Sequence, residues 1–147
     1  MNGTDFIQVA TDWSKSATVG EPTWRSSTSR AYYGAFHIAR DFLEVHLGFT
    51  GKFRLFKSHQ KVYDALGNSG NEHAREAGRK LRQFANRRHM ADYELQDAGS
   101  GNQKAAEHSI LDAEEIKGYI DKVVTDCRDP KILGAMKIRV AQWIAAQ

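Results

Sequence analysis

The sequence has one cysteine, two prolines and no long apolar run in its 147 residues. Cys127 alone cannot form an intrachain disulfide or supply a cysteine zinc site, and no His-Glu-x-x-His motif offers another metal site. No stretch approaches the ~18 apolar residues of a transmembrane helix. The N-terminal residues lack the basic start and apolar core of a signal peptide. These absences predict a cytoplasmic protein with no membrane segment, no metal and no cofactor.

Proline and glycine also set the expected architecture. No proline occurs between Pro22 and Pro130, which is typical of long helices. No segment alternates polar and apolar residues with β-branched enrichment, so strands are not expected. Pairs of glycines indicate where helices stop and turns follow; they are Gly48 and Gly51, Gly67 and Gly70, and Gly99 and Gly101.

The segments between these breaks have helical periodicity. Helices are predicted at residues 4–17, 23–47, 57–66, 71–95, 102–127 and 130–146. Their lengths and short turns predict an all-α, up-down antiparallel helical bundle in one domain, residues 1–147, with the last helix as a C-terminal extension. Segment 23–47 is expected at the centre of the core because it carries two adjacent apolar stripes. They are Ala31, Ala35, Ile38, Phe42 and Val45, and Tyr32, Phe36, Ala39, Leu43 and Leu47.

Charge is distributed unevenly along the chain. The net charge of +3 divides into −1 for residues 1–50, +6 for residues 51–93, −5 for residues 94–129 and +3 for residues 130–147. Two interpretations fit the +6 block: a face that binds phosphate, since clustered cations release counterions from nucleic acid, or a basic helix packed beside the acidic one. The candidate RNA-binding residues of this block are Arg75, Arg79, Arg82 and Arg87.

The apolar stripe of segment 71–95 is interrupted by charge. It runs through Leu81 and Phe84 to Leu95, and Arg88 and Asp92 fall on or beside the same line, four residues apart. Because an isolated buried charge is very costly, these two side chains are expected to pair. The pair either closes the bundle or lines a pocket or dimer cleft together with Tyr93.

Two polar stripes accompany these features. On segment 23–47, polar side chains at three- and four-residue steps predict a solvent or interface face; they are Arg30, Tyr33, His37, Arg40, Asp41 and Glu44. On segment 71–95, the neighbouring stripe ends in His89 and Tyr93, which are groups able to transfer protons.

Three strings in the sequence resemble the HEPN superfamily of small helical proteins. They are RAYYGAFHIA at residues 30–39, SHQKV at residues 58–62 and RHMADY at residues 88–93. The first is similar to the Arg-Ala-Tyr-Tyr-x-x-Phe-His pattern of one HEPN branch, and the third to that branch's Arg-x-x-Ala-Asp-Tyr pattern. The resemblance covers residues 4–126, and segment 130–146 extends beyond it.

The resemblance implies a bundle that forms a homodimer with its functional cleft at the two-fold axis. Many HEPN proteins are metal-independent endoribonucleases of toxin–antitoxin or phage-defence systems. Many are encoded beside a minimal nucleotidyltransferase that neutralises them. Others have lost catalysis and bind a nucleotide, RNA or a partner protein.

The catalytic signature of the family is an arginine followed, after four to six residues, by a histidine. In this chain Arg88 takes the arginine position, and Tyr93 stands where the histidine is expected. Arg82 with His89 is a second candidate. As a ribonuclease, the protein would hold the scissile phosphate with Arg88, orient Arg88 with Asp92 and transfer protons through His89 or Tyr93.

The cleft of such a ribonuclease would also include Arg30, Tyr33 and His37. As a non-catalytic module, the protein would use Arg88 and Asp92 as a structural pair and bind RNA, a nucleotide or a nucleotidyltransferase. A helical scaffold without a nucleic-acid role is the third alternative.

Overall fold

The computed structural model describes residues 1–15, 20–55 and 57–147, and its regular structure there is entirely helical. The all-α class expected from the sequence is therefore confirmed. The helices are α1 (Gly3–Lys15), α2 (Glu21–Asp41), which continues as a π-helix (Phe42–His46), α3 (Ser58–Gly67), α4 (Glu72–Tyr93), a 3-10 turn (Ala98–Ser100), α5 (Gln103–Asp126) and α6 (Pro130–Ala145).

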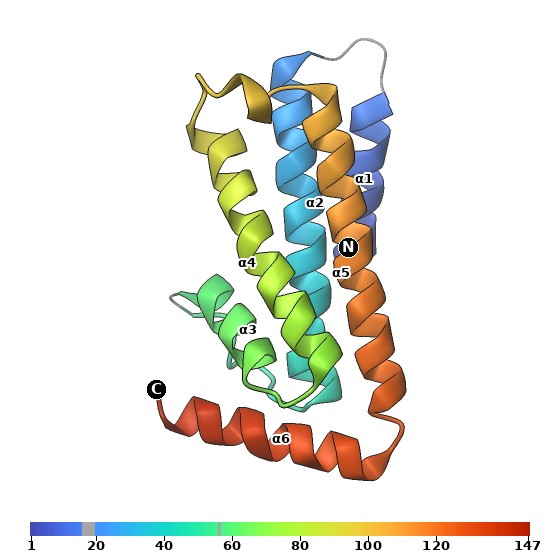
Figure 1. The fold of residues 1–147 in the computed structure, drawn as a ribbon, viewed down its shortest axis with the longest axis vertical. Helices are drawn as coiled ribbons and strands as arrows, with labels where there is room; N and C mark the ends of the chain where they lie inside the picture. The colour runs from blue at the N-terminus through green and yellow to red at the C-terminus, as the bar shows by residue number, and fades with distance from the viewer. Residues whose placement is uncertain (16–19, 56) are drawn as a thin grey trace.

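The helices form a bundle around α2 (Figure 1). Helices α1, α4 and α5 all pack against α2, and α3 packs against α4. Long helices that follow one another along the chain run in opposite directions, so α2 and α5 run in the same direction, and α6 lies across one end of the bundle (Figure 1). This arrangement confirms the helical bundle and the additional C-terminal helix. Within the described ranges, no helix combines the length and apolar character needed to cross a lipid bilayer.

Helix α2 is buried along both predicted apolar stripes up to its last turn. Ala31, Tyr32, Ala35 and Ala39 are fully buried, and Phe36 is almost so. The periodicity of the sequence therefore identified the central helix and its core side chains correctly.

The prediction for the end of this segment was wrong at two positions. Val45 was placed on the apolar stripe, but it is 73% exposed, and Glu44 from the polar stripe is 2% exposed. The π-helix at Phe42–His46 has a wider turn than an α-helix, so Glu44 and Val45 depart from the α-helical period, while Leu43 and Leu47 stay buried as predicted. Arg54 donates two hydrogen bonds to Glu44 Oε2, from Nε at 3.0 Å and Nη2 at 2.7 Å, and these bonds lower the pKa of the buried carboxyl.

Helix α1 also differs from the sequence pattern of residues 4–17, whose helical period predicts a buried stripe of Phe6, Val9, Trp13 and Ala17. Ala17 lies outside the described residues, and Trp13 is 37% exposed. The buried line consists instead of Gly3, Ile7, Ala10 and Ser14. Small residues on this line let α1 approach α2 closely. A search for hydrophobic residues alone does not identify such residues as buried.

The closest approach of α1 and α2 leads to a prediction with opposite effects at two glycines. A Cβ atom on Gly34 would lie 2.6 Å from Ile7 Cγ1 and 2.7 Å from the Gly3 carbonyl oxygen, so we expect Gly34→Ala to cost about 1–3 kcal/mol of unfolding free energy. A Cβ on Gly118 of α5 would meet nothing within 4 Å, so Gly118→Ala should gain up to about 1 kcal/mol from helix propensity. Urea unfolding measures both, and equal effects would contradict the tight crossing.

Candidate active site

The candidate site begins on the core-facing side of α4, where Arg88 and Asp92 interrupt an apolar line. Both side chains are largely buried, with exposures of 19% and 26%, and Arg88 Nη1 lies 3.2 Å from Asp92 Oδ2. The pairing predicted from their spacing is confirmed. Leu95, which was expected to continue the line, is 65% exposed because α4 ends at Tyr93.

Arg88 is held against two tyrosines of α2. Its guanidinium carbon lies 5.3 Å from the ring centroid of Tyr32 and 5.7 Å from that of Tyr33. Ser29 Oγ donates a hydrogen bond of 3.3 Å to Asp92 Oδ2, the same oxygen that Arg88 contacts, and so ties the carboxylate to α2. Burial alone would lower the pKa of Arg88, but Tyr33 and Asp92 outweigh it, and the pKa is raised. The site therefore contains a permanent cation in a defined position.

Helix α3 places a histidine and a tyrosine, His59 and Tyr63, near Arg88. The Tyr32 hydroxyl lies 2.7 Å from His59 Nδ1 and is also hydrogen-bonded to the Tyr63 hydroxyl. The His59 ring stacks on Phe36 with 4.0 Å between centroids and 11° between planes. Burial, with further contributions from Arg88, His37 and Arg40, lowers the pKa of His59 to about 4. At neutral pH His59 is therefore uncharged.

A second cation and a second histidine come from the next turns of α2. Arg40 lies over Phe36 at 5.6 Å, and burial followed by the charge of Arg40 lowers the pKa of the half-buried His37. In the described part of the chain, Nε of Arg40 and Nε of Arg88 are buried without a hydrogen-bond partner. We define the polar cluster as the side chains that meet here from α2, α3 and α4: Tyr33, His37, Arg40, His59, Arg88 and Asp92.

The composition of the polar cluster determines its chemistry. Two guanidinium groups supply fixed positive charge and N–H donors that suit phosphate or carboxylate oxygens. Two uncharged imidazoles offer a nitrogen lone pair or an N–H donor each. Such a set can hold an oxyanion and can move a proton beside it.

The remaining predicted site residues lie outside the polar cluster. His89 and Tyr93 are on the exposed side of α4, with their ring centroids 4.8 Å apart, and Tyr93 is 64% exposed. Arg30 is exposed and lies over Phe6 and Trp13 of α1, 5.8 Å from each ring centroid. Of the three predicted cleft residues, Tyr33 lies against Arg88 and His37 lies next to Tyr33 in the polar cluster, whereas Arg30 lies elsewhere.

Most of the basic side chains of α4 form ion pairs. Arg79 pairs with Glu76, Arg82 with Asp64, Arg87 with Asp112 and Lys80 with Glu115. Two of these pairs cross from α4 to α5, in agreement with the interpretation that the basic segment packs beside the acidic one. Among the described residues, the side chain of Arg75 makes no ion pair. Arg75, Arg79, Arg82 and Arg87 therefore remain RNA-binding candidates, and three of the four are already paired with carboxylates.

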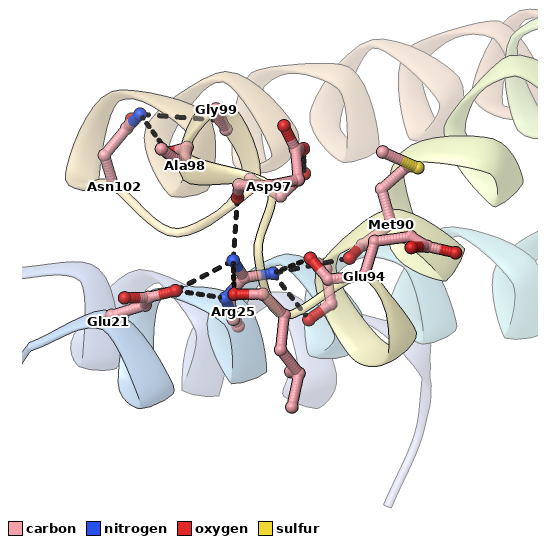
Figure 2. A network of polar contacts seen from close by, with 11 residues as sticks. Glu21, Arg25, Met90, Glu94, Asp97, Ala98, Gly99 and Asn102 are labelled. Carbon is pink, nitrogen blue, oxygen red and sulfur yellow. Dashed lines mark hydrogen bonds and ion pairs between the residues drawn. The ribbon is translucent and has the colours of Figure 1, made fainter.

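Sequence reasoning did not identify Arg25, which fastens the end of α4 to α2 (Figure 2). Its side chain is buried, and Nε lies 2.8 Å from Glu21 Oε1. The guanidinium donates further hydrogen bonds of 2.7–3.3 Å to backbone carbonyls at and beyond the end of α4; they belong to Met90, Ala91, Glu94, Leu95 and Asp97. Among the described residues, the carbonyls of Ala91 and Leu95 accept no backbone N–H and depend on Arg25, whereas those of Met90, Glu94 and Asp97 also accept one. Arg25 thus holds the helical turn of Asp92 against α2.

Sequence reasoning also missed the roles of His59, Tyr32 and Tyr63. His59 was noted only within the SHQKV string, and Tyr32 only as a core residue. A tyrosine on an apolar stripe is itself a signal, because a buried hydroxyl needs a hydrogen-bond partner. That signal shows that a partner must exist but not which residue supplies it.

A separate cavity lies between α4 and α5 and does not include the polar cluster. It has a volume of about 590 Å³, and its walls include Thr28, Arg87, Met90 and His108. Within the described ranges, no three His, Cys, Asp or Glu side chains group in a way that could hold a metal ion.

Comparison with known proteins gave no further assignment. The chain matches no family model, no curated protein and no solved structure.

Proposed function

We propose that the protein is a HEPN-type RNA-binding protein that cleaves RNA at the polar cluster without a metal ion. The three HEPN-like strings supply the expectation. One observation carries the assignment to this site: two guanidinium groups accompany two uncharged histidines, with Arg88 acting on His59 and Arg40 acting on both His59 and His37. These are the types of group that metal-free phosphodiester cleavage requires.

Each step of this reaction has a candidate residue. Arg88 and Arg40 hold the scissile phosphate and stabilise the charge that develops on it. His37, whose lowered pKa keeps it unprotonated at neutral pH, accepts the proton of the ribose 2′-OH. The 2′-oxygen attacks phosphorus, the bond to the 5′-oxygen breaks and a 2′,3′-cyclic phosphate forms. Because His89 and Tyr93 lie outside the polar cluster of their own chain, one of them would return a proton to the leaving 5′-oxygen across the cleft of the proposed dimer.

The biological setting follows from the same resemblance. Two copies of the chain would face each other across a two-fold axis, with the exposed His89 and Tyr93 near the cleft. A toxin or phage-defence ribonuclease needs control, and a minimal nucleotidyltransferase is the partner we propose for it.

A non-catalytic HEPN module is the second candidate function. The observation in its favour is that Arg79, Arg82 and Arg87 are paired with carboxylates, so α4 offers few unpaired cations to guide RNA to the polar cluster for cleavage. In this case Arg88 and Asp92 are a structural pair, and the protein binds RNA, a nucleotide or a partner protein without cleaving.

One assay separates the candidates. Purified protein is incubated in a chelator with RNA and with DNA of the same sequence, and RNA affinity is measured over a range of salt concentrations. We expect RNA to be shortened and DNA to stay intact. Salt-dependent RNA binding without cleavage would contradict the ribonuclease and support the module. Neither cleavage nor salt-dependent binding would contradict both RNA-based functions and leave the helical scaffold.

A further inference from the structure

Three side chains form a hydrogen-bonded row that ends at the polar cluster. The Tyr63 hydroxyl is bonded to the Tyr32 hydroxyl, and the Tyr32 hydroxyl to His59 Nδ1 at 2.7 Å. Tyr32 is fully buried and Tyr63 is 7% exposed. Burial raises the pKa of both phenols, so both keep their hydrogen at neutral pH.

The hydrogens in this row can be arranged in two ways. In the first, Tyr63 donates to Tyr32, and Tyr32 donates to Nδ1 of His59. In the second, His59 donates from Nδ1 to Tyr32, and Tyr32 donates to Tyr63. The second leaves the hydroxyl hydrogen of Tyr63 without an acceptor, because the described residues give Tyr63 no other side-chain partner. A buried donor without a partner is costly, so the first arrangement is favoured.

The favoured arrangement fixes the tautomer of His59. Its Nδ1 accepts a hydrogen bond, so the ring hydrogen is on Nε2. His59 is partly exposed, and its one hydrogen bond to a described residue is at Nδ1, so Nε2 is left for a ligand. The ring cannot turn freely, because it stacks on Phe36 and also contacts Tyr33 edge-on at 5.9 Å.

We propose that His59 is an uncharged hydrogen-bond donor to a phosphate oxygen, held in its Nε2–H form by the Tyr63–Tyr32 row. Its N–H would act beside the guanidinium groups of Arg88 and Arg40, whose charges both act on His59. Tyr32 is then a positioning residue, and the ligand class is an oxyanion of the phosphate type. This inference rests on the proposed function in that it assigns His59 to phosphate binding and leaves proton abstraction to His37.

The protonation of His59 fits this role. A histidine with a pKa of about 4 is a weak base at neutral pH, but it keeps its N–H donor over the whole neutral range. A donor already in place costs no proton transfer when phosphate arrives, which is the advantage of a preorganised group.

The tautomer can be tested without RNA or activity. In protein labelled with ¹⁵N-histidine, two-dimensional NMR at neutral pH distinguishes the Nε2–H form, the Nδ1–H form and the imidazolium. We expect His59 to be in the Nε2–H form. Tyr32→Phe should give a mixture of tautomers, whereas Tyr63→Phe should leave the form unchanged because Tyr32 still donates. An Nδ1–H form or an imidazolium in the wild type would overturn the proposal.

The donor role is tested with inorganic phosphate as the ligand. His59→Gln retains an N–H group near the position of Nε2 and should bind phosphate within about threefold of the wild type, whereas His59→Ala should bind about tenfold more weakly. His46→Ala, at an exposed histidine outside the polar cluster, is the control and should not change binding. Equal affinity of the wild type and His59→Ala would overturn the proposal, as would equal weakening of the Gln and Ala variants.

These results are separable from the proposed function. An Nε2–H tautomer and His59-dependent phosphate binding in a protein that does not cleave RNA would contradict the ribonuclease and retain this inference. Cleavage of RNA by a protein whose His59 is in the Nδ1–H form would support the ribonuclease and contradict this inference.

Discussion

An Arg25→Ala variant should unfold with a free energy about 3 kcal/mol below that of the wild type, because the substitution removes the hydrogen bonds of a buried guanidinium and leaves the carbonyls of Ala91 and Leu95 without a donor. Arg25 bonds to five backbone carbonyls at and beyond the end of α4 (Figure 2), and its side chain is 7% exposed. Urea unfolding followed by circular dichroism measures the loss. The free energy of unfolding of Arg25→Lys should lie between those of the wild type and Arg25→Ala, since an ammonium group has three donors and a guanidinium has five.

Two controls show whether the carbonyls or the ion pair is responsible. Glu21→Ala removes the carboxylate partner of Arg25, but Glu21 is 53% exposed, so we expect a loss below about 1 kcal/mol. Arg128→Ala removes an exposed cation of the same type and should have little effect. If Glu21→Ala and Arg25→Ala lower the free energy of unfolding equally, the account of Arg25 as a cap for α4 is wrong.

Arg88→Ala should have the largest effect on activity. If Arg88 stabilises the charge on phosphorus, its removal should lower the cleavage rate by about 100-fold or more, as is typical for the loss of one such donor. The variant should also be less stable, because Asp92 loses its partner and Tyr32 and Tyr33 lose a cation over their rings. Rates are therefore compared at a temperature where circular dichroism shows both proteins folded.

Further variants separate charge from geometry at this position. Arg88→Lys keeps the charge without the planar fork and should recover only part of the rate. Asp92→Asn keeps the shape of the side chain but removes the charge that orients Arg88. Its cleavage rate should therefore lie between those of the wild type and Arg88→Ala. Arg128→Ala should cleave like the wild type. Wild-type cleavage by folded Arg88→Ala would remove Arg88 from the mechanism.

Most of the fold could be predicted because it follows from periodicity and helix-breaking residues. The observed ends of α3, α4, α5 and α6 lie within two residues of their predicted positions. The pairing of Arg88 with Asp92 was also predictable, since a four-residue spacing on a core-facing line leaves two opposite charges little alternative. Both results depend on information local to one helix.

The features that were missed depend on contacts between helices or on backbone geometry. The π-helix exchanges the environments of Glu44 and Val45, and no residue pattern marks a single wider turn. Arg25 binds backbone carbonyls about 65 to 72 positions away, which carry no sequence signal of their own. The short helix α3 determines that His59 and Tyr63 meet Tyr32, and that placement arises only from packing.

The same distinction explains the outcome for the basic segment. A count of charges along the chain predicts a positive block, but it does not show which cations already have partners. Arg87 and Lys80 are occupied by acidic residues of α5, as the packing interpretation held. Arg40, which was part of a polar stripe and not of the basic block, joins Arg88 at the polar cluster instead.

Product analysis of RNA cut in a chelator tests the central claim most directly, because attack by the 2′-oxygen leaves a defined chemical end. A short RNA is incubated with the wild-type protein, alongside the same RNA carrying a 2′-deoxy group at the cleaved position. We expect 2′,3′-cyclic phosphate ends from the first RNA and no cleavage of the second at that position. An uncut RNA, or 3′-hydroxyl ends that appear only when a divalent metal is added, would contradict metal-free cleavage at the polar cluster.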